Sequence, residues 1–249
     1  MRTWPYPAIV AHRGGGKLAP ENTLEGIDEG ARRGLRMIEF DAKLSADNVV
    51  FLLHDDDVDR TSNGHGPARS MTYAQIRALD AGSWFGKPFA GAHMPTLAEV
   101  HARCAELDMA ANVEIKPCPG REVETGELVA RETARLWASA EPAPLLSSFS
   151  YVALQAARNA APELPRGMLY EEVPVDWREQ TSALACVSLH ASHRHLSEAL
   201  VREIKDAGLR VLAYTPNEPE RVKLLAQWGV DAICTDRIDI IGADFLAGS

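Results

Sequence analysis

The chain has 249 residues, of which 46% are hydrophobic and 24% are charged, and its formal net charge is −9. This composition predicts one globular domain over residues 1–249 with a sizeable core, and α/β barrels commonly have this length. The negative charge argues against nucleic acid and anionic membranes as partners, because both require a basic surface.

The first residues, Met1-Arg2-Thr3-Trp4-Pro5-Tyr6-Pro7, lack the apolar core of a signal peptide. No apolar run reaches the length of a membrane span. We therefore expect a cytoplasmic protein without stable membrane insertion, and a homo-oligomer stays compatible with the sequence. The four cysteines are widely spaced and form no CxxC pair, which argues against a disulfide framework or a zinc site.

A strand followed by a helix recurs about eight times along the chain. The first strand is expected at 8–11, and a helix follows at about 23–33, with Asn22 and Glu25 as its predicted cap. Later helices are expected at 197–207 and 218–228, before Gly208 and Gly229. Further strands are expected near 35–44, 49–53, 111–116, 145–147, 166–170, 186–190, 210–214 and 231–235. Alternation of this kind predicts an α/β fold of parallel strands with crossover helices.

Residues 55 to about 94 interrupt this rhythm with Asp, Gly and Pro around a short helix near 73–79. The segment follows the second strand unit, so we expect an insertion in a βα loop on the face where barrels hold their chemistry. Its acidic run Asp55-Asp56-Asp57 resembles a calcium loop, but it lacks the glycine and the terminal glutamate of an EF-hand. We interpret the run as a cluster that orders the loop.

Two short strands carry charge on one face, at residues 38–42 and 112–116. Strand side chains alternate between faces, so Glu39 and Asp41 share one face, and Glu114 lies on the polar face of the second strand. Three carboxylates in one barrel mouth would repel one another unless a cation lay between them, and Mg²⁺ and Ca²⁺ take oxygen ligands. The alternative is a pair of edge strands with solvated outer faces. The repetition on two strands favours the cation site.

Two histidines, His12 and His54, follow strands in the same way. Acid–base catalysis needs one group that takes a proton and another that returns it. Arg13 and the glycines after it suit an anionic substrate, and Lys116 is a natural partner for a phosphoryl oxygen. Taken singly, the turn at His12 and Arg13 is equally consistent with polar surface residues, a lone histidine at a strand end is more often structural, and a lysine such as Lys116 at a strand end is commonly a surface residue. Weaker candidates for the mouth follow the sixth strand of the rhythm, at His190, His193 and His195.

Together these residues resemble the glycerophosphodiester phosphodiesterases along nearly the whole chain. The resemblance rests on the order and spacing of His12-Arg13-Gly14, Pro20-Glu21-Asn22-Thr23, Glu39-Phe40-Asp41, His54-Asp55, Asp59-Arg60-Thr61, Met94-Pro95-Thr96-Leu97, Asn112-Val113-Glu114-Ile115-Lys116, Ser147-Ser148-Phe149 and Thr235-Asp236. It implies a (β/α)8 TIM barrel with a small insertion after the second strand. It also implies one divalent cation, Mg²⁺ or Ca²⁺, on Glu39, Asp41 and Glu114, and catalytic histidines at His12 and His54.

The chain departs from the family pattern at two places. Tyr214-Thr215-Pro216-Asn217 stands where the family often has Trp-Thr-x-Asn, and Arg237 stands where a proline often follows Thr-Asp. The first departure alters a residue expected in the wall of the substrate pocket. Neither departure touches the expected cation ligands or histidines.

The resemblance implies hydrolysis of a small glycerophosphodiester to glycerol 3-phosphate and an alcohol. We expect Arg13 and Lys116 to bind the phosphate, His12 to act as the base and His54 as the acid. The nucleophile is either water or the glycerol hydroxyl of the substrate. One alternative function is a lysophospholipase D-like activity with an apolar rim at Trp84, Phe85 and Phe89; another is a non-catalytic binding barrel.

Overall fold

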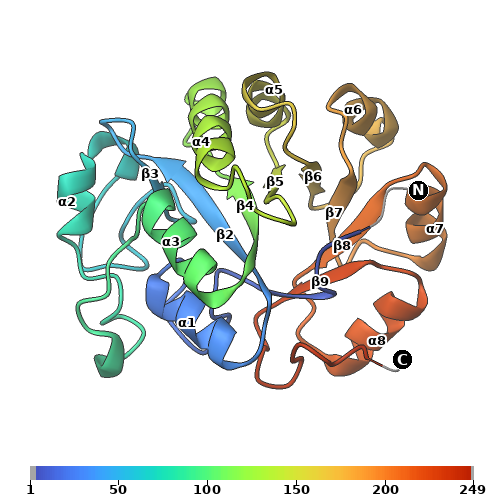
Figure 1. Ribbon diagram of the computed structural model, residues 1–249, viewed down its shortest axis with the longest axis horizontal. Helices are drawn as coiled ribbons and strands as arrows, with labels where there is room; N and C mark the ends of the chain where they lie inside the picture. Colours follow the sequence, from blue (N-terminus) through green and yellow to red (C-terminus); the bar gives the residue numbers. More distant parts are fainter. Residues whose placement is uncertain (1–3, 248–249) are drawn as a thin grey trace.

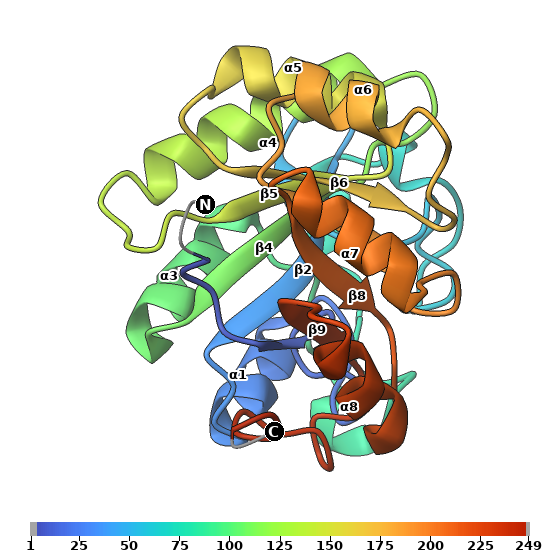
Figure 2. The same ribbon diagram turned by 90° about the vertical axis from the view of Figure 1, so that its right-hand side faces the viewer.

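The computed structural model describes residues 4–247 and shows a closed barrel (Figures 1 and 2). Strand β1 pairs with both β2 and β9, and this double pairing closes the sheet. Within the described residues, the strands are β1 (Ile9–Ala11), β2 (Met37–Leu44), β3 (Val50–Leu52), β4 (Ala110–Ile115), β5 (Leu145–Ser148), β6 (Arg166–Tyr170), β7 (Ser188–Ser192), β8 (Arg210–Tyr214) and β9 (Ala232–Thr235). All ladders are parallel except that of β3, which runs antiparallel to β2 at the edge.

Helices alternate with the parallel strands and cover the outside of the barrel (Figure 2). In the described part of the chain, the helices are α1 (Leu24–Arg32), η1 (Ala68–Ser70), α2 (Tyr73–Arg77), η2 (Lys87–Phe89), α3 (Leu97–Leu107), α4 (Glu122–Leu136), α5 (Tyr151–Ala160), α6 (Trp177–Ala183), α7 (Glu198–Asp206) and α8 (Pro219–Gln227). This arrangement confirms the (β/α)8 TIM barrel expected from the sequence. None of the helices in residues 4–247 is both long and apolar enough to cross a bilayer.

The alternation along β2 separates an apolar face from an acidic one. Ile38, Phe40 and Ala42 belong to the core between the barrel and its helices, where they are at most 1% exposed. Glu39 and Asp41 face the other way, into the barrel. The parallel register places Asp41 opposite Glu114 of β4. Two strands distant in sequence therefore present their carboxylates side by side.

Apolar side chains fill the lower part of the barrel interior. They form a second cluster made of Tyr6, Val10, Met37, Leu145, Leu212, Ala232 and Cys234. Inward residues of a TIM barrel pack in layers, so this cluster is a solid floor and not a channel. A cavity inside the barrel is therefore confined to the carboxyl ends of the strands.

The start of α1 differs from the expectation. Thr23 is the N-cap, and its hydroxyl accepts the backbone N–H of Gly26. Asn22, the expected cap, has a left-handed backbone with φ of 56°. Its side-chain amide instead donates to Asp41 at 2.8 Å. The expected cap residue therefore positions a carboxylate of the site.

The segment between β3 and α3 has a small core of its own. Buried residues gather there around Phe51 and Ile76, both 0% exposed. A capping box at Thr72 and Gln75 fixes the start of α2. Asp56 of the acidic run orders the loop as expected, since it accepts from Lys43 at 3.1 Å, and nearby Asp59 accepts from the backbone of Gly66 at 2.7 Å.

Candidate active site

Three buried carboxylates lie together at the carboxyl ends of β2 and β4. Oxygens of Glu39, Asp41 and Glu114 lie within 4.8 Å of one another. The three residues are 5%, 1% and 7% exposed, respectively. The structure therefore brings together all three residues expected to bind a cation.

The charges of these groups are strongly coupled. Burial, and then the negative charge of Asp41, raises the pKa of Glu39 to about 8 and that of Glu114 to about 7. Burial alone would also raise the pKa of Asp41, but Arg13 and Lys116 lower it to about 2. Asp41 is therefore an anion at neutral pH, whereas Glu39 and Glu114 bind protons more tightly than ordinary glutamates do.

The donor set fits a hard divalent cation. Every ligand atom is a carboxylate oxygen, which is the type of donor that Mg²⁺ and Ca²⁺ prefer. Glu39 Oε1 is buried and has no hydrogen-bond partner among the described residues. A cation would give this oxygen a partner and offset the repulsion that raises the pKa of Glu39. Within residues 4–247, no other group of three His, Cys, Asp or Glu residues has this arrangement.

His12 lies next to this cluster, directly after β1. Its Nδ1 lies 2.6 Å from Oδ1 of Asp236, and its Nε2 lies 3.9 Å from Oε2 of Glu39. A carboxylate can only accept, so Nδ1 carries the proton and Nε2 faces the carboxylates. Asn217 holds Asp236 from the other side with an N–H···O bond of 3.0 Å. Burial lowers the pKa of His12, but Asp236 and Glu39 outweigh it and raise the pKa.

His54 has a matching partner. Its Nδ1 lies 2.6 Å from Oδ1 of Asp55, and Arg60 donates to the same carboxylate at 2.6 Å. Arg60 also donates twice to Glu21, at 2.8 Å each, and Arg13 donates to Glu21 at 2.8 Å. This chain of ion pairs ties the His54 loop to the loop after β1. Burial lowers the pKa of His54 and, with the nearby cations Arg13 and Lys116, outweighs the effect of Asp41 and Asp55.

The two expected phosphate ligands border the carboxylates. Arg13 Nε lies 3.5 Å from Oδ2 of Asp41, and Lys116 Nζ lies 3.0 Å from Oε1 of Glu114. The backbone of Arg13 is left-handed, with φ of 50°, and its N–H donates to Glu39 at 3.1 Å. Both cations therefore lie beside the carboxylates, where a phosphate bound at this cluster would meet them.

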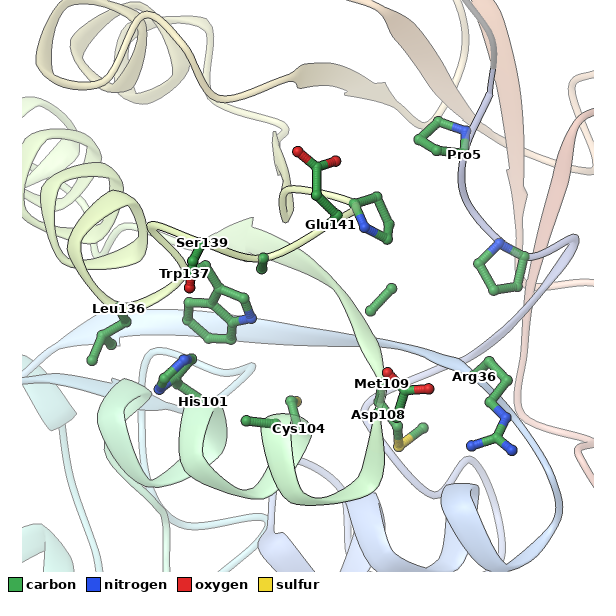
Figure 3. Close-up of a pocket in the computed structure, with 15 residues that line it drawn as sticks. Pro5, Arg36, His101, Cys104, Asp108, Met109, Leu136, Trp137, Ser139 and Glu141 are labelled. Carbon is green, nitrogen blue, oxygen red and sulfur yellow. The ribbon is translucent and has the colours of Figure 1, made fainter.

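A cavity of about 260 Å³ opens above these groups. It is lined by both histidines, both phosphate-binding candidates, Glu39 and Glu114. A wider groove of about 580 Å³ lies at the opposite end of the barrel, between α3, the end of α4 and the segment before β1 (Figure 3). Residues before β2 and β4, such as Arg36 and Asp108, line that groove. Active sites of TIM barrels lie at the carboxyl ends of the strands, so the smaller cavity is the candidate site.

The structure separates the remaining candidates. His190 lines the floor of the cavity and is 0% exposed, and burial lowers its pKa to about 3. His193 and His195 do not line it. The lysophospholipid alternative needed an apolar rim, but Trp84 and Phe89 each pack edge to face on Phe85, and none of the three lines the cavity.

Sequence reasoning assigned no role to the carboxylates that hold the histidines. Asp236 follows β9, which pairs with β1 only because the barrel closes. The position of Asp236 directly after the last strand could have indicated this role, because the last strand of a closed barrel lies beside the first strand, which His12 follows. Gly16 reflects the same proximity, because a Cβ there would collide with the carbonyl of Asp236.

Comparison with known proteins shows to which family the chain belongs. Residues 12–240 match the model of the glycerophosphoryl diester phosphodiesterase family. The chain belongs to this family. It is 32% identical to a glycerophosphodiester phosphodiesterase of Caldanaerobacter subterraneus subsp. tengcongensis, across 92% of this chain and 93% of the relative. A glycerophosphodiester phosphodiesterase of Bacillus subtilis is 29% identical across 93% of this chain and 84% of the relative.

Solved structures of the family share the barrel. The phosphodiesterase of Oleispira antarctica, solved with the product sn-glycerol-3-phosphate, superposes with a TM-score of 0.88 and 34% identity. The match covers 93% of this chain and 94% of that one. A glycerophosphodiester phosphodiesterase of Agrobacterium tumefaciens gives a TM-score of 0.76 at 26% identity, over 98% and 100% of the two chains.

Proposed function

We propose that this family member hydrolyses glycerophosphodiesters to glycerol 3-phosphate and an alcohol with the help of one divalent cation, Mg²⁺ or Ca²⁺. One observation carries the proposal. A single cavity is lined by two members of the carboxylate cluster, Glu39 and Glu114, by two cationic side chains and by two histidines that are each held by a carboxylate. A non-catalytic barrel would not require both histidines to be oriented in this way.

We assign the cation to Glu39, Asp41 and Glu114. When bound, it supplies a Lewis acid for a phosphoryl oxygen. Arg13 and Lys116 balance the negative charge that grows on the phosphate during the reaction, and in a buried cavity such charge pairs are stronger than in water.

His12 and His54 form the proposed acid–base pair. Their Nδ1 atoms are engaged by Asp236 and Asp55, so Nε2 is the atom that can exchange a proton with substrate. The pKa of His12 is raised and that of His54 is lowered, which favours His12 as the acid and His54 as the base, opposite to the order expected from the sequence. We propose the pair, and the leaving-group experiment in the Discussion assigns the order.

The proposed catalytic unit is residues 1–249, with the segment at about 55–94 as an insertion that supplies Asp55 and Arg60. We propose the cytoplasm as its compartment and a small molecule as its substrate. The three carboxylates are at most 7% exposed and border a cavity of about 260 Å³, which suits a small molecule better than a bulky polymer.

The direct test is release of glycerol 3-phosphate from glycerophosphodiesters by purified protein, with EDTA and with each cation added back. We expect release that needs Mg²⁺ or Ca²⁺ and that falls in Glu114→Gln. An analogue without the glycerol 2-hydroxyl distinguishes the nucleophiles, because only attack by that hydroxyl would be lost. Absence of release from every diester with either cation would refute the proposal.

A further inference from the structure

The outer wall of the cavity differs in chemistry from its carboxylate side. Phe149 follows β5 and Tyr214 ends β8, and both line the cavity. Their ring centroids lie 5.8 Å apart at an interplanar angle of 82°. Strands β6 and β7 separate β5 from β8, so the two rings meet across part of the mouth.

An open carboxylate lies next to this aromatic pair. Glu171 directly follows β6 and lines the cavity, and its side chain is 65% exposed. Tyr214 directs its hydroxyl toward Glu171 Oε2 at 3.4 Å while donating to the carbonyl of Tyr170 at 2.8 Å. In the described part of the chain, no lysine or arginine pairs with Glu171, and His195 Nε2 is its nearest basic atom at 3.8 Å. The negative charge of Glu171 is therefore available to a ligand.

The phosphate position fixes the geometry of a bound diester. Lys116 Nζ, a proposed phosphate ligand, lies 5.4 Å from the centroid of the Phe149 ring. A substrate arm that leaves the phosphate past Phe149 would therefore pass Tyr214 and reach Glu171. Along this path the arm would contact the two aromatic rings in turn, starting near the cationic Lys116 and ending at the anionic Glu171.

The other arm of the diester has a better place on the floor of the cavity. Asn112 Oδ1 and His190 Nδ1 are buried there and have no hydrogen-bond partner among the described residues. A glycerol hydroxyl that reached either atom would give it a partner, and an unpaired buried polar atom is costly. The glycerol arm therefore belongs on the floor and the alcohol arm against the aromatic wall.

We propose that Phe149, Tyr214 and Glu171 form a subsite for a positively charged alcohol, such as the choline or ethanolamine ester of glycerol phosphate. Aromatic rings attract alkylammonium groups, and a neighbouring carboxylate adds to the attraction. A neutral alcohol such as glycerol gains neither interaction. This inference rests on the proposed function and names its preferred substrates.

The test compares glycerophosphocholine, glycerophosphoethanolamine and glycerophosphoglycerol by their kcat/KM for release of glycerol 3-phosphate. We expect wild-type protein to favour the choline ester over the glycerol ester. In Glu171→Gln the ratio of the two should fall ~5-fold, mostly through KM, which is the scale of one exposed cation–π or ion-pair contact. Phe149→Leu should lower the ratio in the same direction.

Glu172→Gln is the matched control, because Glu172 is the exposed neighbour and does not line the cavity. It should leave the ratio unchanged. Added salt should reduce the wild-type preference, since it screens an exposed charge. If wild-type protein hydrolyses the esters equally, or if Glu171→Gln keeps the wild-type ratio, the subsite is refuted and the hydrolase remains. If no ester is hydrolysed, the proposed function itself fails.

Discussion

Removal of the divalent cation should destabilise the folded protein, and by more at pH 8 than at pH 6. Without the cation, the pKa of Glu39 is about 8 and that of Glu114 is about 7, against an ordinary value of 4.5. Between 4.5 and these values, the folded state keeps protons that the unfolded state has released. These two groups therefore reduce the free energy of unfolding as the pH rises through this range. A cation takes the place of these protons, so its stabilisation is largest where they are already lost.

The size of the effect follows from the two pKa values. At pH 8, a cation at a hundred times its Kd stabilises the folded state by about 2.7 kcal/mol. For a chain of this size, that is about 5–10 °C in melting temperature. At pH 6, the cation must displace a proton from each carboxyl. Because this pH lies below the pKa of Glu39, about 8, and below that of Glu114, about 7, the competition with protons weakens the apparent affinity for the cation ~10³-fold. The same concentration then stabilises by less than about 0.1 kcal/mol.

Melting curves with EDTA and with Mg²⁺ or Ca²⁺, at pH 6 and at pH 8, measure this difference. At each pH the two samples differ only in the cation, so the difference between their melting temperatures measures its stabilisation. Glu114→Gln should lose the shift, and its cation-free form should melt above cation-free wild type at pH 8, because one repelling charge is gone. Glu172→Gln should behave as wild type. An equal shift at both pH values, or a shift kept in Glu114→Gln, would show that these carboxylates do not hold the ion.

Three further predictions concern the histidines and the segment between β3 and α3. His12→Ala and His54→Ala should each lower turnover by ~10²- to 10⁴-fold with an unchanged melting temperature. A p-nitrophenyl leaving group should partly rescue only one of them, which identifies the acid; rescue of both or of neither would contradict the assigned pair. Asp236→Asn should lower kcat by ~10²- to 10⁴-fold with little change in KM, because the amide no longer fixes the tautomer of His12; a normal kcat and pH profile would make Asp236 merely structural. Ile76→Ala removes a side chain that is 0% exposed and should cost about 2–5 kcal/mol; hydrogen exchange should then accelerate in residues 53–96, and uniform protection would argue against a separate small core there.

Patterns within single strands predicted much of the site. The alternation of Glu39 and Asp41 with apolar neighbours predicted which side chains enter the barrel, because strand geometry fixes that choice locally. The pattern within one strand could not predict that Glu114 lies beside Asp41, because this depends on the register between β2 and β4. Repetition of the acidic pattern indicated a shared site but could not supply that register.

Features that depend on closure of the barrel were beyond local reasoning. Asp236 pairs with His12 across 224 positions of sequence, and only the pairing of β9 with β1 brings them together. The cap of α1 was wrong for a related reason. Asn22 has the side chain of a good cap, but its bond to Asp41 and its left-handed backbone remove it from that role.

The pairing of β1 with β9 also bears on how the protein is made. A nascent chain that has reached β8 already contains every carboxylate of the proposed cation site, and both histidines. It lacks the acidic partner of His12, because Asp236 is translated only after the last strand. The backbone bond from His12 to Thr235, at 3.1 Å, likewise forms only when that strand is in place. Enzyme turnover should therefore appear late in synthesis, only after β9 has paired with β1 and closed the barrel.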